Sequence, residues 1–206
     1  MRGEIAIYGA GGHAKVVIEA VRALVPDATL LIVDDAAPSD HALLGLSVAG
    51  DRSWLAARRP GGGVVPALGN NQARAAVLAW LTAERIAATT IVHPRATVSP
   101  SAELGAGVFV AAGAVINAQA RIGDGAIVNT CASIDHDCAI GAAAHIAPGA
   151  HLCGAVRVGP GTLVGAGATI IPGIQVGANV VIGAGSTVIR NLPDGARVVG
   201  SPARPV

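Results

Sequence analysis

The sequence predicts an α/β half-domain followed by a coil of parallel β-strands. Three observations support this fold class: an aliphatic residue recurs at every sixth position from Val92 to Val188, glycine often follows that residue, and the segment before residue 86 alternates between strand-like and helix-like patterns. A chain of 206 residues, 52% of them hydrophobic, is long enough to bury the cores of two modest domains. We therefore expect one domain over residues 1–88 and a second over residues 89–206.

The N-terminal domain is expected to alternate between strands and helices. The strand patterns EIAIYG, TLLIVDD and GVVPALGN lie at residues 4–9, 29–35 and 63–70, and the helical patterns HAKVVIEAVRAL and NQARAAVLAWLTAER at 13–24 and 71–85. Such alternation predicts a small parallel sheet. The size of the segment corresponds to about half of a nucleotide-binding fold, so we describe it as a Rossmann-like half-domain.

The C-terminal domain is expected to be a triangular coil in which three six-residue repeats complete each turn. A second series of small or apolar residues lies four positions after each aliphatic one, and neither series contains a charge. Both series therefore point inward, and stacked turns at about 4.8 Å bury them in one continuous core. The aliphatic series is Val92, Val98, Leu104, Val110, Ile116, Ile122, Val128, Ile134, Ile140, Ile146, Leu152, Val158, Val164, Ile170, Val176, Ile182 and Val188.

Charge and composition exclude several classes of protein. Fourteen basic and thirteen acidic residues leave a formal charge of +1, so we expect no nucleic-acid partner. Neither a signal peptide nor a run of 18 apolar residues is present, so we expect a soluble, cytoplasmic protein without membrane insertion. The cysteines Cys131, Cys138 and Cys153 form no CxxC pair, which argues against a disulfide framework or a zinc knuckle and favours simple packing.

The segment YGAGGHAK, residues 8–15, predicts a site for phosphate between a strand and a helix. Bare backbone NH groups at Gly11 and Gly12 and the helix N-terminus favour an anion, and Asp34 and Asp35 end the next strand where an acid can bind a sugar hydroxyl. The segment is too short for NAD, so a nucleotide-sugar diphosphate fits better. The alternative is a tight structural turn.

Three further residues bear on this cradle. His13 either donates a hydrogen bond to the phosphate or is only a turn residue. Gly69 and Asn70 end a later strand, where they either line the same cleft or serve as an ordinary helix cap.

The segment TCASIDHDCAIGAAAHI, residues 130–146, concentrates polar residues in a coil that has few charges. The register places Ile134 and Cys138 inward, so the three residues between them, with His136 in the middle, face outward. An imidazole beside a carboxylate is held in one tautomer and made more basic, as a general base requires. The alternative is a solvated surface. Asn129 and His145 also fall on outward positions.

Six motifs spread over nearly the whole chain resemble one family: YGAGGHA, VDD, LGNNQAR, NTCASIDHDCAIGAAAH, LCG and VVGSPARPV. Together they are similar to the sialic acid O-acetyltransferases and nucleotide-4-amino-sugar N-acetyltransferases, which are hexapeptide-repeat acyltransferases. The resemblance implies that the coil is a left-handed parallel β-helix. It also implies an acetyl-CoA-dependent homotrimer, without a metal, whose active sites lie between adjacent coils.

The resemblance also implies roles for individual residues. His136 matches the general base and Asp137 the acid that raises its basicity; because Asp135 also flanks His136, which acid reaches the ring stays open, with Asp137 favoured. The implied acetyl-CoA contacts are His145, Gly154 through its backbone NH, Pro202 and Arg204, although the last two could equally serve tail packing. The implied nucleotide-sugar contacts are Gly11, Gly12, His13, Asp34, Asp35 and Asn129.

These expectations lead to one main functional hypothesis and three alternatives. The main hypothesis is direct transfer of acetyl from acetyl-CoA to the amine of a nucleotide-activated amino sugar, with O-acetylation of sialic acid or its nucleotide-activated form as the alternative in the same class. A zinc carbonic anhydrase would use His136, His145 and His151, but their spacing lacks the close pair expected there. A non-catalytic β-solenoid scaffold is the third alternative.

Overall fold

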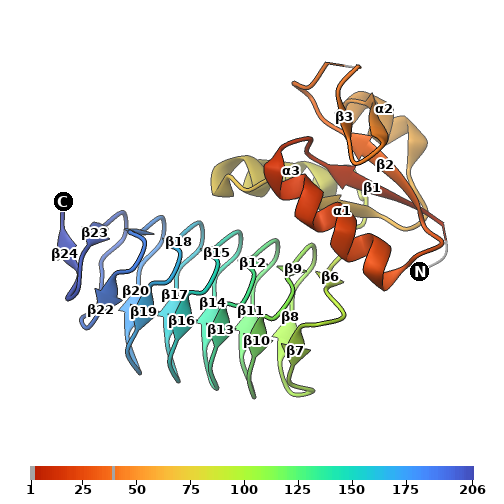
Figure 1. The fold of residues 1–206 in the computed structure, drawn as a ribbon. Helices are drawn as coiled ribbons and strands as arrows, with labels where there is room; N and C mark the ends of the chain where they lie inside the picture. Colours follow the sequence, from red (N-terminus) through yellow and green to blue (C-terminus); the bar gives the residue numbers. More distant parts are fainter. Residues whose placement is uncertain (1–2, 39) are drawn as a thin grey trace.

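The computed structural model describes residues 3–38 and 40–206, which form an α/β domain seated on one end of a long coil (Figure 1). The α/β domain contains β1 (Glu4–Tyr8), α1 (Gly12–Leu24), β2 (Thr29–Val33), β3 (Ala42–Leu43), β4 (Leu46–Gly50), α2 (Arg52–Arg58), β5 (Val64–Pro66) and α3 (Asn71–Ala83). Its sheet has the order β3-β4-β2-β1-β5 and is parallel except for the antiparallel β3–β4 pair.

The three strands and two helices predicted for this domain are confirmed, whereas the β3–β4 hairpin and α2 were not predicted. The hairpin turns at Leu44 and Gly45, which both have positive φ. Helix α2 has only seven residues, too few to give a clear helical period. It begins where the Asp51 side chain accepts a hydrogen bond from the Trp54 N–H at 2.9 Å, and it buries Leu55 against the sheet.

The coil consists of short strands that follow one another at the six-residue period predicted from the sequence. The strands are β6 (Ile91–Val92), β7 (Thr97–Val98), β8 (Glu103–Leu104), β9 (Phe109–Val110), β10 (Val115–Ile116), β11 (Arg121–Ile122), β12 (Ile127–Val128), β13 (Ser133–Ile134), β14 (Ala139–Ile140), β15 (His145–Ile146), β16 (His151–Leu152), β17 (Arg157–Val158), β18 (Leu163–Val164), β19 (Thr169–Ile170), β20 (Gln175–Val176), β21 (Val181–Ile182) and β22 (Thr187–Val188). The chain ends with β23 (Arg197–Val199) and β24 (Arg204–Pro205), which pair antiparallel.

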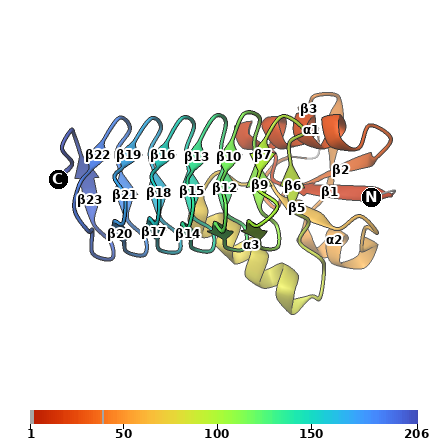
Figure 2. The ribbon, with the colours of Figure 1, turned by 90° about the horizontal axis from the view of Figure 1, so that it is seen from below.

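Every third strand pairs in parallel, so the strands of the coil form three sheets, which appear as rows along the coil in Figure 2. We call the sheet from β6 through β9, β12, β15, β18, β21 and β23 to β24 the covered sheet, because the α/β domain lies on it. The other two sheets contain β7-β10-β13-β16-β19-β22 and β8-β11-β14-β17-β20. We call the column of turns that directly follow β7, β10, β13, β16, β19 and β22 the open edge.

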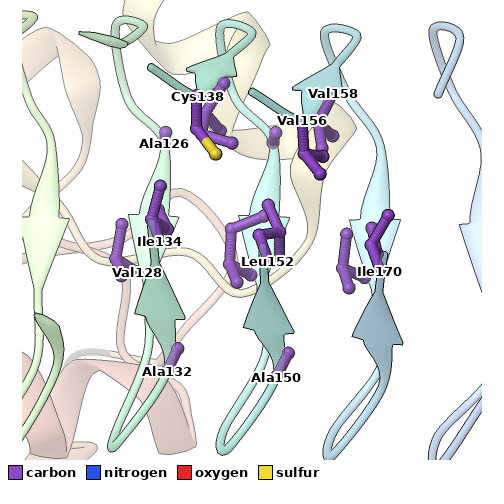
Figure 3. Packing of buried hydrophobic residues seen from close by; sticks show 14 of the residues in the cluster. Ala126, Val128, Ala132, Ile134, Cys138, Ala150, Leu152, Val156, Val158 and Ile170 are labelled. Carbon is purple, nitrogen blue, oxygen red and sulfur yellow. The ribbon is translucent and has the colours of Figure 1, made fainter. Parts of the chain in front are cut away.

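The inward rows predicted from the sequence are the core of the coil. Ile116, Ile134 and Leu152 are in register on neighbouring rungs and are at most 2% exposed, and Cys138 is buried in the row beside them (Figure 3). Each rung closes the apolar face of the previous one, so burial depends on stacking. Burial of apolar surface contributes about 25 cal/mol per Å², so these rows stabilise the coil.

The α/β domain sits on the covered sheet because the first rungs carry apolar residues on their outward side. Ile91, Phe109 and Ile127 point out of the coil, yet each is completely buried in a core shared with α1 and β1. The next outward position in this column is His145, where the apolar contact ends. This interface places the start of α1 beside His145. Among the described residues, no helix has both the length and the apolar character needed to cross a membrane.

Candidate active site

His136 stands on the open edge with Asp137 directly beside it. The Asp137 carboxylate lies 2.7 Å from Nδ1 of His136, and more than half of each side chain is exposed. Asp137 has a φ of 62°, in the left-handed region that aspartate tolerates better than most residues. This turn conformation brings the carboxylate back to the ring of the preceding residue. The other ring nitrogen, Nε2, has no hydrogen-bond partner among the described residues.

Asp135 makes different hydrogen bonds in the same turn. It accepts hydrogen bonds from the backbone N–H of His136 at 2.8 Å and from the Asn117 side chain at 3.1 Å. Of the two flanking acids, Asp137 is therefore the one that contacts the imidazole. The hydrogen bond that the His136 ring donates to Asp137, followed by the negative charge of Asp135, raises the pKa of His136 above its usual value of 6.5.

Gly154 lies one rung further along the open edge, directly below the imidazole. A Cβ atom at this position would come within 2.6 Å of both Cε1 and Nε2 of His136, so only glycine leaves room for the ring as placed. Gly154 is buried, while the neighbouring Ala155 N–H donates to the His136 carbonyl at 2.9 Å. Stacking of the rungs thus fixes the height of the histidine above the Gly154 backbone.

A second group of polar residues lies on the covered sheet, around His145 and His13. The Asn129 amide is 3.0 Å from Nε2 of His145, and its oxygen accepts from the Thr130 N–H at 2.8 Å. Because that oxygen is occupied, the Asn129 NH2 group faces His145 and donates to Nε2. The rings of His13 and His145 are 6.4 Å apart.

Both of these histidines are neutral at neutral pH. Burial, followed by the charge of Arg74, lowers the pKa of His13 and of His145 to about 4. His13 packs edge-on against Phe109 at 5.3 Å, and its Nε2 is buried without a hydrogen-bond partner among the described residues. An unsatisfied buried nitrogen is costly. A ligand acceptor or donor at this place would remove the cost.

The glycine segment forms the predicted turn between β1 and α1. Gly11 is the N-cap of α1 without a side-chain hydrogen bond, and Cβ atoms added at Gly11 or Gly12 would meet nothing within 4 Å. Gly9 has a φ of 122°, and a Cβ atom there would lie 2.8 Å from the Ala67 carbonyl oxygen. The start of α1 therefore has open space beside Gly11 and Gly12, and no acidic residue lies in its first turn to repel an anion.

The carboxylate oxygens of Asp34 and Asp35 mainly accept hydrogen bonds from other groups of the protein. Asp34 accepts from the N–H groups of Ala10, Ala36 and Ala37 at 2.8, 2.8 and 2.9 Å. It thereby ties the glycine turn to the end of β2.

Asp35 accepts from the Tyr8 hydroxyl at 2.6 Å and pairs with Arg52. Both acids line an open cavity of about 400 Å³ with Trp54. Their role as sugar ligands stays a prediction.

The remaining predicted site residues lie at the strand ends and at the C-terminal tip. The side chain of Asn70 accepts from the Ala73 N–H at 2.9 Å, the ordinary helix cap that the sequence left open, while Gly69 lines a cavity of about 500 Å³ together with His145. Pro202 and Arg204 are at the far tip of the coil, where Pro202 is exposed. The tail is anchored there by the Ala203 N–H, which donates to Thr187 at 2.8 Å.

The two groups of site residues lie on different sides of one chain. His136 and Gly154 belong to the open edge, which is opposite the covered sheet that carries His145 and the α/β domain. The third histidine considered for zinc, His151, is on the six-stranded sheet with its Nδ1 2.8 Å from the Ser133 hydroxyl. His136, His145 and His151 thus do not converge within one chain, and no cluster of three metal-ligating side chains occurs in residues 3–38 and 40–206.

Sequence reasoning missed one residue close to these groups, Arg74 of α3. It is fully buried and contacts the coil as well as the loop at Gly69. The motif LGNNQAR contained it, but an arginine on a helix with apolar spacing gave no signal that it would be buried.

Known proteins match the chain over both domains. A family described as the PglD N-terminal domain matches residues 4–81, and a family described as bacterial transferase hexapeptide (six repeats) matches residues 155–190. Comparison with curated proteins gave no match.

Several solved structures are similar over almost the entire chain. A histidine mutant of perosamine N-acetyltransferase from Caulobacter crescentus, in complex with CoA and GDP-perosamine, is 42% identical with a TM-score of 0.93, covering 99% of this chain and 97% of that chain. The acetyltransferase domain of PglB from Neisseria gonorrhoeae FA1090 is 38% identical with a TM-score of 0.92, covering 98% and 99%. WeeI from Acinetobacter baumannii AYE is 25% identical with a TM-score of 0.91, covering 100% of both chains. The expected fold, a Rossmann-like half-domain followed by a left-handed parallel β-helix, is confirmed.

Proposed function

Because the chain belongs to the hexapeptide-repeat family of nucleotide-sugar acetyltransferases, we propose that it transfers the acetyl group of acetyl-CoA directly to the amine of a nucleotide-activated amino sugar. The observation that carries the proposal is the imidazole of His136, held by Asp137 above the backbone of Gly154. The relative at 42% identity is named as an N-acetyltransferase, which favours an amine over a hydroxyl acceptor. O-acetylation of sialic acid or its nucleotide-activated form is the alternative.

His136 acts as the general base in this proposal. The sugar nitrogen attacks the thioester carbonyl, and its proton passes to Nε2 of His136 while Asp137 holds the proton on Nδ1. The C–S bond then breaks, and the departing CoA sulfur takes the proton from Nε2. Because Asp137 and Asp135 raise the pKa of His136, the ring is a stronger base than free imidazole. No covalent acetyl-enzyme is needed.

Gly154 would stabilise the negative charge that develops on the thioester oxygen. The Gly154 backbone lies beneath the reacting nitrogen of His136, and among the described residues its N–H group donates to no protein acceptor. A backbone donor fixed by the stacked rungs does not have to reorganise during the reaction, which is the property that makes oxyanion stabilisation effective.

The acyl carrier is proposed to lie along the open edge towards the C-terminus. From Gly154 onwards the edge presents exposed apolar side chains, Ile171 at 36% and Ile189 at 38% exposure. An open groove of about 640 Å³ adjoins this edge on the five-stranded sheet and is lined by Arg157 and Gln175. The apolar side chains suit the pantetheine arm of acetyl-CoA, whereas arginines towards the tip, such as Arg204, suit its phosphates.

A complete active site would require two copies of the chain. The nucleotide sugar bound at Gly11, Gly12 and His13 lies over the covered sheet, while His136 of the same chain faces the opposite side. A neighbouring copy that places its open edge against the covered sheet would bring the base to the amine. This division supports the expected homotrimer, in which every copy can offer both surfaces.

The proposal is tested by measuring release of the CoA thiol from acetyl-CoA with GDP-, UDP- and CMP-activated amino sugars, and with hydroxyl acceptors in parallel. We expect release with an amine acceptor only, and a loss of at least about 100-fold in kcat/KM for His136→Ala. His151→Ala is the matched control because it removes a histidine from the same coil outside the site. Release with hydroxyl acceptors alone would establish O-acetylation. Full activity of His136→Ala would show that His136 is not the general base.

A further inference from the structure

Arg74 is the one charged residue that is fully buried among residues 3–38 and 40–206. It lies in the first turn of α3, where the helix crosses the edge between the five-stranded sheet and the covered sheet. The function proposed above makes no use of it. A residue that is costly to bury and sits between the two domains therefore needs its own explanation.

The guanidinium gathers carbonyl groups from two separate parts of the structure. Its Nε donates to Gly125 at 2.7 Å, and its Nη2 donates to Ala143 at 2.8 Å and Ala144 at 3.3 Å, all on coil turns. Its Nη1 donates to Leu68 at 2.8 Å and Gly69 at 3.3 Å, in the loop between β5 and α3. One side chain thus links the loop of the α/β domain to two successive rungs of the coil.

None of these partners carries a charge that would balance Arg74. The only side-chain acceptor is the Asn71 amide oxygen, at 2.9 Å, and no salt bridge involves Arg74 within the described part of the chain. Burial lowers the pKa of Arg74 to about 10, which still leaves it charged at neutral pH. Because an apolar residue of similar volume often stabilises a core equally well, stability alone does not explain a buried cation here.

The linked segments enclose His145. Ala143 and Ala144, whose carbonyls bind Arg74, directly precede His145 in the chain, and Gly69 lines the same cavity as His145, where its backbone opposes the lowering of the ring's pKa. The Asn129 amide donates to Nε2, so the single proton of the neutral His145 ring is on Nδ1. Arg74 therefore holds both the backbone below His145 and the carbonyl beside it.

We propose that Arg74 is a positioning residue that fixes the loop at Leu68 and Gly69 against the coil and so sets the ring orientation and the Nδ1–H tautomer of His145. The inference rests on the proposed function, together with the contacts expected from the sequence: His145 with acetyl-CoA, and the adjacent cradle with the nucleotide sugar. Only a planar group with several N–H donors can reach both segments at once. A lysine keeps the charge but reaches one segment at most.

The kinetic test uses Arg74→Lys and Arg74→Met, with Arg121→Lys and Arg121→Met as matched controls. Arg121 is largely exposed on the coil and pairs with the exposed Glu103 at 3.7 Å. Well below the unfolding temperature of each variant, we expect both Arg74 variants to raise KM for acetyl-CoA and nucleotide sugar at least tenfold, and to change kcat by less than threefold. A purely structural role would leave both constants of the folded variants unchanged. Wild-type KM in Arg74→Lys would overturn the proposal.

The second test uses nitrogen NMR of the histidine rings and does not depend on activity. In the wild-type protein at pH 6, we expect His145 to be neutral with its proton on Nδ1, and in Arg74→Lys we expect a mixture of tautomers. A protonated Nε2 in the wild type would overturn the role of Arg74 even if no Arg74 variant folds. If the wild type shows the expected tautomer but transfers no acetyl group, the proposed function fails and the positioning role stands.

Discussion

The Cβ atom that Gly154 lacks would lie 2.6 Å from Nε2 of His136, the ring nitrogen that faces away from Asp137. The two residues belong to successive rungs and are one full turn of the coil apart. Parallel stacking therefore sets the distance between the base and the backbone below it.

Gly154→Ala is expected to lower kcat/KM at least about 100-fold, because the new methyl group displaces the imidazole from the position above the backbone N–H. The thiol-release assay measures the loss. Gly61→Ala is the control, since a Cβ atom there meets nothing within 4 Å. An active Gly154→Ala with an unchanged pH profile would show that the ring does not work from this position.

We expect kcat/KM to fall on the acidic side of the pH profile, with the midpoint of this fall, the acid limb, above pH 6.5. His136 must be unprotonated to act as a base, and its pKa is raised mainly by Asp137, so activity increases as the pH rises through that raised value. Asp137→Asn removes the main cause, which moves the limb to lower pH and reduces the plateau by about 10- to 100-fold. Asp135→Asn, which loses only the second cause, should move the limb less. The reverse order would assign the orienting role to Asp135.

Two inactive variants are expected to restore activity when their subunits are mixed. His136→Ala removes the base from the open edge, and Gly12→Glu places a negative charge where the phosphate would bind, in open space at the start of α1. Mixed oligomers formed by unfolding and refolding the two proteins together would contain some sites with neither change. Activity in the mixture, and none in either protein refolded alone, supports shared sites. Persistent inactivity in verified mixed oligomers argues that each chain has a complete site.

The stability of the fold is expected to decrease as the pH falls from about 6.5 to about 4. His13 and His145 have pKa values of about 4 in the folded protein and about 6.5 when unfolded, so the unfolded chain binds more protons throughout this window. Each histidine should reduce the free energy of unfolding by up to about 1.4 kcal/mol per pH unit. Urea unfolding at several pH values measures the slope. His145→Gln should make it shallower, and an unchanged slope would contradict burial of a neutral ring.

The sequence alone determined the coil and the side on which His136 lies. A six-residue period repeats one local structure, so the inward rows and the outward position of His136 follow from counting, as burial of Ile134 and Cys138 shows. The main strands and helices of the α/β domain were predicted from their own strand-like and helix-like spacing of apolar residues. The hairpin β3–β4 and the seven-residue α2 were not, because neither is long enough to establish a period.

Only the tertiary structure decided how the two domains meet and which polar groups satisfy one another. It placed Phe109 outside the coil but inside a shared core, buried Arg74 between the loop at Gly69 and the coil, and brought Asp137 rather than Asp135 to the imidazole. The period describes contacts between equivalent positions of successive rungs. The contacts of Phe109, Arg74 and Asp137 join positions that no repeat relates. Their partners therefore become defined only when the chain has folded.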